Sequence, residues 1–207
     1  MLGRVLFIEG NVMKFNFLGY LLAAFLVIFN ANAGDDSLYK IINSQDKSAF
    51  LDLLTVGYEI DEQDVEGNTP LMIASALGKA NFVQFLLSKG ANPNQKNYIG
   101  VTSLHRAAQG GYNDIVEKLI DYGAQVNMPD MDGITPLMKA VENEQRFTVE
   151  LLVRRGAIIL FRNAKGKTAL DIAKEKRLSK IHTFLEEQLK NNNDNKDLGP
   201  KYSWENL

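Results

Sequence analysis

Few side chains in this sequence could do acid–base or metal chemistry. It contains two histidines, His105 and His182, and no cysteine, which excludes disulfides, thiolate metal sites and thiol nucleophiles. The two histidines form no His-Glu-x-x-His pair, and the chain contains neither a Gly-x-Ser-x-Gly sequence nor a phosphate-binding glycine loop. We therefore expect a protein that is not an enzyme and that holds no cofactor and no metal ion.

Carboxylates are more frequent, but their sequence context does not favour catalysis. A cluster at Asp61, Glu62, Asp64 and Glu66 falls in a loop-forming stretch, and solvated loops lack the burial that tunes a carboxylate for proton transfer. The formal net charge of −2 gives no indication of nucleic acid or an anionic membrane as a partner. We expect His182 to be solvated as well.

The N-terminal residues predict a secretory signal peptide over residues 1–33. Lys14 precedes the apolar run 17–29, which the small-residue sequence Ala31-Asn32-Ala33 follows. A positive region, a short apolar core and an A-x-A site are the three parts of such a signal. The run is shorter than the roughly 20 residues that span a bilayer, so we expect cleavage after Ala33 and a protein in the periplasm or secreted.

Two alternatives stay open at this end of the chain. An uncleaved signal would anchor the same domain to the membrane. Residues 1–12 could be an extension of the start site, since Met13-Lys14 opens a normal signal, or Arg4 could belong to the positive region.

Beyond residue 33 the sequence repeats itself with a step of 33 residues. A glycine recurs at each step, and threonine, leucine and alanine recur in register with it. The recurring positions are Gly67, Gly100, Gly133 and Gly166; Thr69, Thr102, Thr135 and Thr168; Leu71, Leu104, Leu137 and Leu170; and Ala74, Ala107, Ala140 and Ala173. A period in this range predicts a solenoid, in which each unit buries its apolar side against its neighbours.

Each recurring residue has a physical role in a helix–turn–helix unit. The glycine suits a turn with positive φ, and Thr69-Pro70 is typical of the start of a helix. A second helix is predicted by the apolar spacing of Val83, Leu86 and Leu87, and the pair Gly90-Ala91 ends it.

These residues resemble the ankyrin-repeat family. The segments Gly67-Asn68-Thr69-Pro70-Leu71 and Gly90-Ala91-Asn92-Pro93-Asn94 are similar to the family's G-x-T-P-L and G-A-D-V-N. The resemblance implies an all-α repeat solenoid with a hairpin loop in each unit, and a structural role for His105 between adjacent repeats. Over residues 34–190 we expect five units, at 34–66, 67–99, 100–132, 133–165 and 166–190.

The first and last units are expected to be caps. Asp36-Ser37-Leu38 replaces Thr-Pro-Leu in the first unit, and the fifth unit carries His182 and Glu186 where earlier units have apolar residues. Polar residues there suit a face on which no further repeat stacks.

The fourth unit departs from the pattern in two places. Glu144 replaces the glycine between its helices, so we expect Asn143 to supply the left-handed residue. In its closing loop we expect Ile158 and Leu160 to be packed and Phe161 to be exposed.

Residues 191–207 are predicted to be a disordered polar tail, because the run 191–197 holds too little apolar surface to order itself. The last residues carry the only tryptophan, Trp204. This segment either folds back on the last repeat or binds a partner.

The resemblance implies a partner-binding concave face made of hairpin tips and the ends of the first helices. We expect an apolar centre at Tyr98 and Met131, although these side chains could instead only contact neighbouring hairpins. The candidate residues are Tyr98, Ile99, Val101, Gln109, Tyr122, Met131, Asp132, Ile134, Glu142, Asn143 and Arg155, with Val65, Glu66, Asn68 and Lys89 from the second unit.

Two functions fit this organisation. The first is a monomeric, exported adaptor or scaffold that binds a protein partner, with no nucleic acid and, after cleavage of the signal, no membrane involved. The second is a secreted effector or inhibitor that blocks an enzyme of a host or competitor. An enzyme would need a convergent buried polar cluster in the groove.

Overall fold

The computed structural model describes residues 34–191, and residues 1–33 and 192–207 are not described. The chain divides into two compact units, Met1–Asp36 and Ser37–Leu207, and the second contains the repeats. The predicted signal peptide and the tail segment with Trp204 therefore lie outside the described residues.

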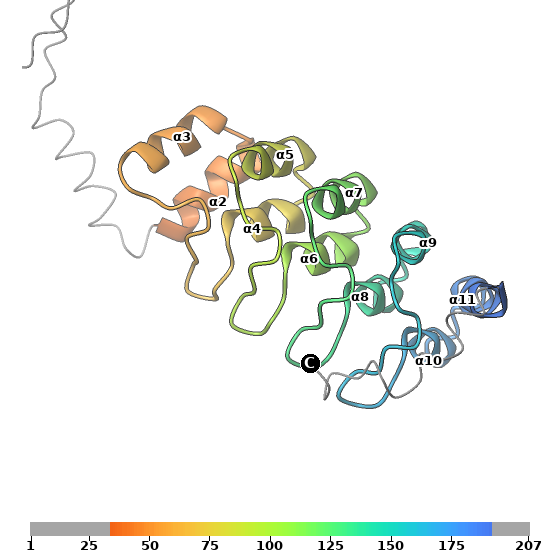
Figure 1. Cartoon of the computed structure of the whole chain (residues 1–207). Coiled ribbons are helices and arrows are strands. Elements are labelled where there is room, and N and C mark those ends of the chain that lie inside the picture. The colour runs from red at the N-terminus through yellow and green to blue at the C-terminus, as the bar shows by residue number, and fades with distance from the viewer. Residues whose placement is uncertain (1–33, 192–207) are drawn as a thin grey trace, which may run out of the picture. The chain divides into compact units, whose positions relative to one another are not determined.

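The described part of the chain consists of pairs of helices, in which a short turn joins the two helices of a pair and a long loop leads to the next pair. α4, α6, α8 and α10 stack as an inner row, α5, α7, α9 and α11 stack as an outer row, and the loops project from one side (Figure 1). None of the described helices is long and apolar enough to cross a membrane. The helices are α2 (Gly34–Ser44), α3 (Lys47–Thr55), α4 (Pro70–Ala76), α5 (Ala80–Ser88), α6 (Ser103–Gly110), α7 (Asn113–Asp121), α8 (Pro136–Glu142), α9 (Arg146–Arg154), α10 (Ala169–Glu175) and α11 (Ser179–Asn191).

The recurring threonine caps each inner-row helix. The Thr69 hydroxyl accepts the Met72 N–H at 3.3 Å, and Thr135 caps α8 in the same way. Pro70 is the first residue of α4, where the missing N–H costs nothing. The predicted helix starts are therefore confirmed.

The turn between the two helices of each unit contains one residue in the left-handed conformation. In the fourth unit this residue is Glu144 itself, with φ +60°, while Asn143 has φ −100°, so the prediction for Asn143 is wrong. The reason is the hydrogen bond from the Gln145 N–H to the Ala140 carbonyl at 2.9 Å. This bond closes the turn, and it requires the left-handed conformation at the residue directly before Gln145. The five equivalent residues, with φ from +58° to +73°, are Gln45, Gly78, Gly111, Glu144 and Arg177.

The core runs continuously between the two rows. Leucines of the outer row at the same position of each unit are fully buried, and the alanines of the inner row let adjacent helices approach closely. These residues are Leu86, Leu119, Leu152 and Leu185, and Ala74, Ala107, Ala140 and Ala173. The all-α repeat solenoid predicted from the sequence is confirmed.

The first and last units contribute to this core from one side only. In the first unit the buried ring of Phe50 lies edge-on to Phe82 of α5, with ring centroids 5.6 Å apart. In the last unit Ile181 and Leu185 are buried, and His182 is only half-buried beside Glu186. His182 is thus less solvated than expected from the sequence.

The closing loop of the fourth unit is arranged differently from the prediction. Ile158 and Leu160 are half-buried and pack against the core, as expected, but Phe161 is only 2% exposed and Ile159 is fully buried. The chain turns at residues 159–160, and this turn directs Ile159 and Phe161 into the core. The expected exposure of Phe161 is therefore wrong.

The burial of Phe161 gives a stability prediction with a matched control. Phe161→Ala removes a fully buried ring and should lower the free energy of unfolding by about 3–5 kcal/mol. Phe147→Ala truncates a side chain on α9 that is 70% exposed, so it should change the free energy by less than about 0.5 kcal/mol. Urea unfolding followed by circular dichroism measures both, and equal losses would contradict the assignment.

Candidate interaction surface

A recurring Asp or Asn shapes each hairpin tip. The Asp130 Oδ1 accepts the N–H groups of Asp132 at 3.0 Å and Ile134 at 2.8 Å. In the preceding hairpin Asn97 accepts those of Ile99 and Val101. The four equivalent residues, each 33 apart, are Asp64, Asn97, Asp130 and Asn163. One side-chain oxygen thus replaces a backbone partner for two amides of every tip.

Backbone hydrogen bonds join each tip to the next. The Met131 N–H donates to the Ile99 carbonyl at 3.1 Å, and the Ala164 N–H donates to the Asp132 carbonyl at 2.9 Å. The Tyr98 N–H makes the corresponding bond to the hairpin before it, at 3.4 Å. The tips therefore form one connected row.

A second set of amide side chains joins the bases of neighbouring loops. Asn94 accepts the Gln125 N–H at 2.8 Å and donates to the Gly123 carbonyl at 2.8 Å. Asn127 makes the same two bonds to the next loop, and Asp61 accepts the Asn92 N–H. Burial raises the pKa of Asp61. These loop carboxylates and amides are structural, and Asp61 is not the open, solvated carboxylate expected from the sequence.

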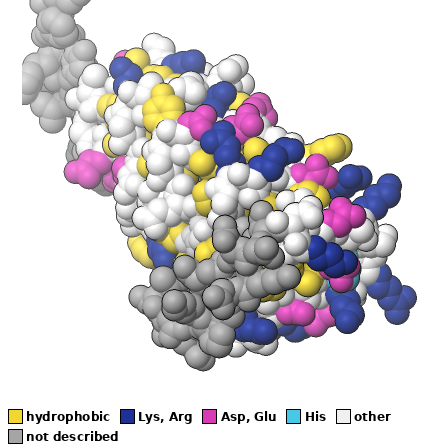
Figure 2. Space-filling view, turned by 45° about the vertical axis from the view of Figure 1, so that its right-hand side comes forward, with side chains coloured by type: hydrophobic (Ala, Val, Ile, Leu, Met, Phe, Trp, Pro, Cys, Tyr) yellow, Lys and Arg dark blue, Asp and Glu magenta, His cyan; other side chains and the backbone are white. Residues whose placement is uncertain are grey.

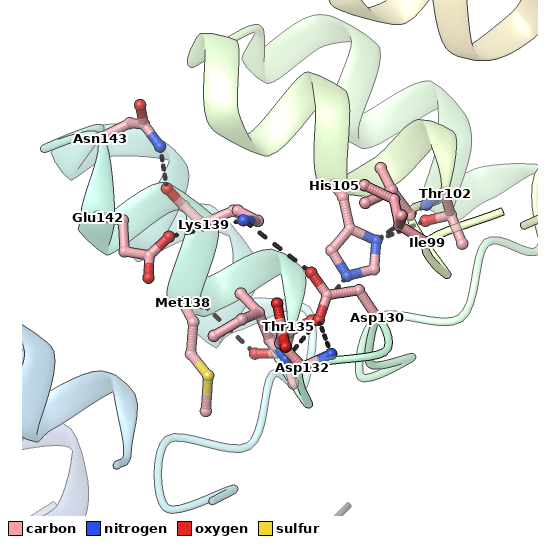
Figure 3. Close-up of polar contacts among 12 residues, drawn as sticks. Ile99, Thr102, His105, Asp130, Asp132, Thr135, Met138, Lys139, Glu142 and Asn143 are labelled. Carbon is pink, nitrogen blue, oxygen red and sulfur yellow. Dashed lines mark hydrogen bonds and ion pairs between the residues drawn. The ribbon is translucent and has the colours of Figure 1, made fainter. Parts of the chain in front are cut away.

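His105 connects two units beneath the tips (Figure 3). Its Nε2 lies 2.9 Å from the Ile134 carbonyl, and its Nδ1 lies 3.2 Å from the Thr102 amide nitrogen. Burial lowers the pKa of His105 to about 4, so the neutral ring donates from Nε2 and accepts at Nδ1. The structural role implied by the resemblance is confirmed by these contacts.

Charged residues of α8 lie beside this histidine. The Lys139 Nζ is 4.0 Å from the Asp130 carboxylate and 3.7 Å from that of Glu142 (Figure 3). Burial raises the pKa of Asp130 despite the neighbouring lysine. Both Asp130 oxygens are engaged by backbone amides or Lys139, so the group serves the hairpin and offers no free base.

The outer ends of the tips are apolar. Four large side chains on three consecutive tips face solvent, and we call them the tip surface. Their exposed fractions are 81% for Val65, 61% for Tyr98, 58% for Ile99 and 69% for Met131. Loop tips of soluble proteins are ordinarily polar, and an exposed apolar cluster with a polar rim is typical of a binding surface.

Three residues predicted for this surface are buried instead. Val101, Ile134 and Asn68 lie beneath the tips and are less than a tenth exposed. Because the Asp or Asn of each hairpin turns the second residue before the helix inward, their side chains belong to the core. Their assignment as exposed contact residues is wrong.

Three further predicted residues lie at the ends of outer-row helices. The Tyr122 hydroxyl accepts from Gln84 at 2.8 Å, and Arg155 forms an ion pair with Asp121 at 2.8 Å. Lys89 occupies the same position after α5. All three are exposed and lie outside the tips, and Tyr122 and Arg155 serve contacts between outer-row helices.

The remaining predicted residues are polar and are divided between the tips and the C-terminal ends of the inner-row helices. Asp132 and Glu66 are exposed at the tips themselves, and Gln109 and Asn143 are exposed at the ends of α6 and α8. Glu142 is half-buried in its contact with Lys139.

Charge of neither sign dominates the face toward the later repeats. Figure 2 shows lysine and arginine side chains interspersed with aspartate and glutamate on its right-hand side. Lys167, for example, lies 2.6 Å from the Glu175 carboxylate. Among residues 34–191 no group of three or more His, Cys, Asp or Glu side chains could hold a metal ion.

Two features of the surface were missed by the sequence interpretation. One is the Asp or Asn of every tip, which recurs at the same step of 33 residues as the glycine three positions later. The other is Phe147, which is exposed on α9. A comparison at steps of 33 finds it, since Asn81 and Asp114 stand at its position in earlier units.

Comparison with known families gives two matches. A model described as ankyrin repeats in three copies matches residues 38–130, and a model of the single ankyrin repeat matches residues 132–164. Together they cover more than half of the chain. No individual curated protein matches the sequence.

The low pKa of His105 predicts a pH-dependent stability. Between about pH 6.5 and pH 4 the unfolded chain binds a proton at this residue and the folded chain does not, so stability falls as the pH falls through this window. From pH 7 to pH 5 this contribution amounts to about 2 kcal/mol. Urea unfolding at pH 7 and pH 5 measures the free energy of unfolding. Between these two pH values it should fall less in His105→Gln than in the wild type, by that amount.

His182→Gln is the control for this measurement. It replaces the other histidine of the chain, which is half-buried beside Glu186 on α11, and so separates the effect of the buried site from that of losing a histidine. The raised pKa of Asp130 contributes stability that is lost as the pH rises above about 3.8, and this effect is common to all three proteins. An identical pH dependence in His105→Gln and the wild type would exclude a buried neutral histidine.

Proposed function

Because the chain belongs to the ankyrin-repeat family, we propose that it binds a protein partner through the tip surface. Ankyrin repeats are generally protein–protein interaction modules and are typically non-enzymatic. The observation that carries the proposal is the exposure of Val65, Tyr98, Ile99 and Met131 on adjacent tips. The repeat framework requires none of these apolar side chains.

The rigidity of the tips supports this function. Each tip is held by a side-chain oxygen and by a backbone bond to its neighbour, as at Asn97 and Met131. A surface that is ordered before binding loses little conformational entropy when the partner arrives. The favourable contacts of Tyr98 and Met131 with a partner would therefore not be offset by the cost of ordering the loops.

The composition of the surroundings supports a macromolecular partner. Asp132 and Glu66 supply exposed polar groups on the tips beside the apolar centre, which is the arrangement of core and rim found in protein interfaces. Small molecules bind in concave sites. A row of projecting side chains instead provides an extended contact area, which suits the surface of another protein.

We further propose that the protein acts outside the cytoplasm, as an exported adaptor or scaffold. The support is the sequence of residues 14–33, with its positive, apolar and A-x-A parts, which precedes the first unit at Gly34. A secreted effector or inhibitor would use the same surface and differ only in the location of its partner.

The first test is the affinity for a partner captured by crosslinking in the native organism and identified by mass spectrometry. Tyr98→Ala or Met131→Ala should each weaken binding by about 1–3 kcal/mol, since each removes a large side chain from the centre of the interface. Isothermal titration calorimetry with the purified partner measures the change. Phe147→Ala is the matched control, because it truncates an equally exposed apolar residue on α9. Unchanged affinity in the Tyr98/Met131 double variant would refute the proposal.

The second test is the location and the N-terminus of the mature protein. Export with cleavage after Ala33 yields a chain beginning at Gly34, recovered by osmotic shock for an adaptor or from the culture supernatant for an effector. N-terminal sequencing of the recovered protein measures the cleavage site. A cytoplasmic protein that begins at Met1 or Met13 would refute export.

A further inference from the structure

A groove lies between the loops of the third and fourth units. It has a volume of about 690 Å³ and is lined by residues 125–131 of one loop, by Ile158 and Phe161 of the next, and by Lys96. We call it the loop groove. Much of its lining is apolar, since it includes Val126, Met128, Pro129 and Ile158.

The solenoid itself does not require this apolar lining. One unit earlier, the residues 33 positions before Met128, Pro129 and Ile158 are Gln95, Lys96 and Gln125. The same backbone thus tolerates polar residues at these positions. Met128 and Ile158 are only half-buried, so part of their apolar surface remains accessible in the groove.

The chain holds a segment suited to this groove. Residues 192–207 follow α11 and include Trp204, the only tryptophan, together with Tyr202 and Leu207. Tryptophan offers a large apolar surface, and the groove presents apolar side chains such as Val126, Met128 and Ile158. We propose that the segment 201–207 docks in the loop groove of its own chain with Trp204 as the anchor.

The length of the connection and the charges agree with this occupant. α11 packs on α9 and α10, in the units next to the groove, and the chain from Asn191 to Trp204 can span roughly 40 Å. A tether of this length gives the segment an effective concentration of about a millimolar at the groove. The Lys96 ammonium group donates to the Pro129 carbonyl at the groove, at 3.1 Å. In the docked state it would also pair with the carboxylate of Glu205.

Docking of the segment requires no partner, so it is tested on the purified full-length protein alone. Because Trp204 is the only tryptophan, its fluorescence reports on this segment without interference. We expect an emission maximum shifted to the blue of that in concentrated guanidinium chloride, and severalfold weaker quenching by acrylamide. Emission and quenching equal to those of the unfolded chain would overturn the proposal.

The variant that tests the groove is Met128→Gln with Ile158→Gln, which installs the residue found one unit earlier at each position. It should shift the emission to the red and raise the quenching constant, while circular dichroism and cooperative unfolding stay as in the wild type. Val65→Gln, on a distant and exposed tip, should leave the emission unchanged.

Two outcomes would contradict the proposal even if Trp204 is shielded. An emission maximum that is unaffected by the Met128/Ile158 change would place the tryptophan elsewhere. A blue shift that disappears on dilution would assign the groove to the segment of a second copy. Neither outcome depends on the partner affinity of the tip surface, which is measured separately.

Discussion

One side-chain oxygen at the base of each hairpin holds the loop side of this molecule together. At Asp64, Asn97, Asp130 and Asn163 it accepts two backbone N–H groups that the tight turn leaves without a backbone partner. An unsatisfied buried amide costs about 1–3 kcal/mol. Loss of this oxygen would therefore release the tip, and with it the direction of every side chain that the tip presents.

The position of that oxygen decides which tip residues face solvent. In the third hairpin it orients Met131 outward and Ile134 inward, and in the second it separates exposed Ile99 from buried Val101 in the same way. His105 continues the arrangement beneath the tips by bonding the Ile134 carbonyl of the following unit. The interaction surface and the core are thus two sides of one hydrogen-bonded framework.

The sequence predicted those features that depend on position within a unit. The threonine caps, the buried leucines and alanines, and the positive φ of Gly67 and Gly90 all follow from a repeating pattern combined with helix geometry. Phe161 and Val101 could not be placed in this way, because they lie in irregular backbone where neither the helical period nor strict alternation fixes the direction of a side chain. For Glu144 the turn geometry outweighed the preference of its residue type, since the hydrogen bond that closes the turn is the same in every unit.

The left-handed turn between helices also makes the units unequal. The second and third units carry Gly78 and Gly111 there, whereas the first, fourth and fifth carry Gln45, Glu144 and Arg177. A side chain in this conformation costs on the order of 1 kcal/mol relative to glycine. In a stack where each unit contacts only its neighbours, such a cost remains local and lowers the energy needed to open that unit. We therefore expect the second and third units to be the last to open, after the units on either side of them.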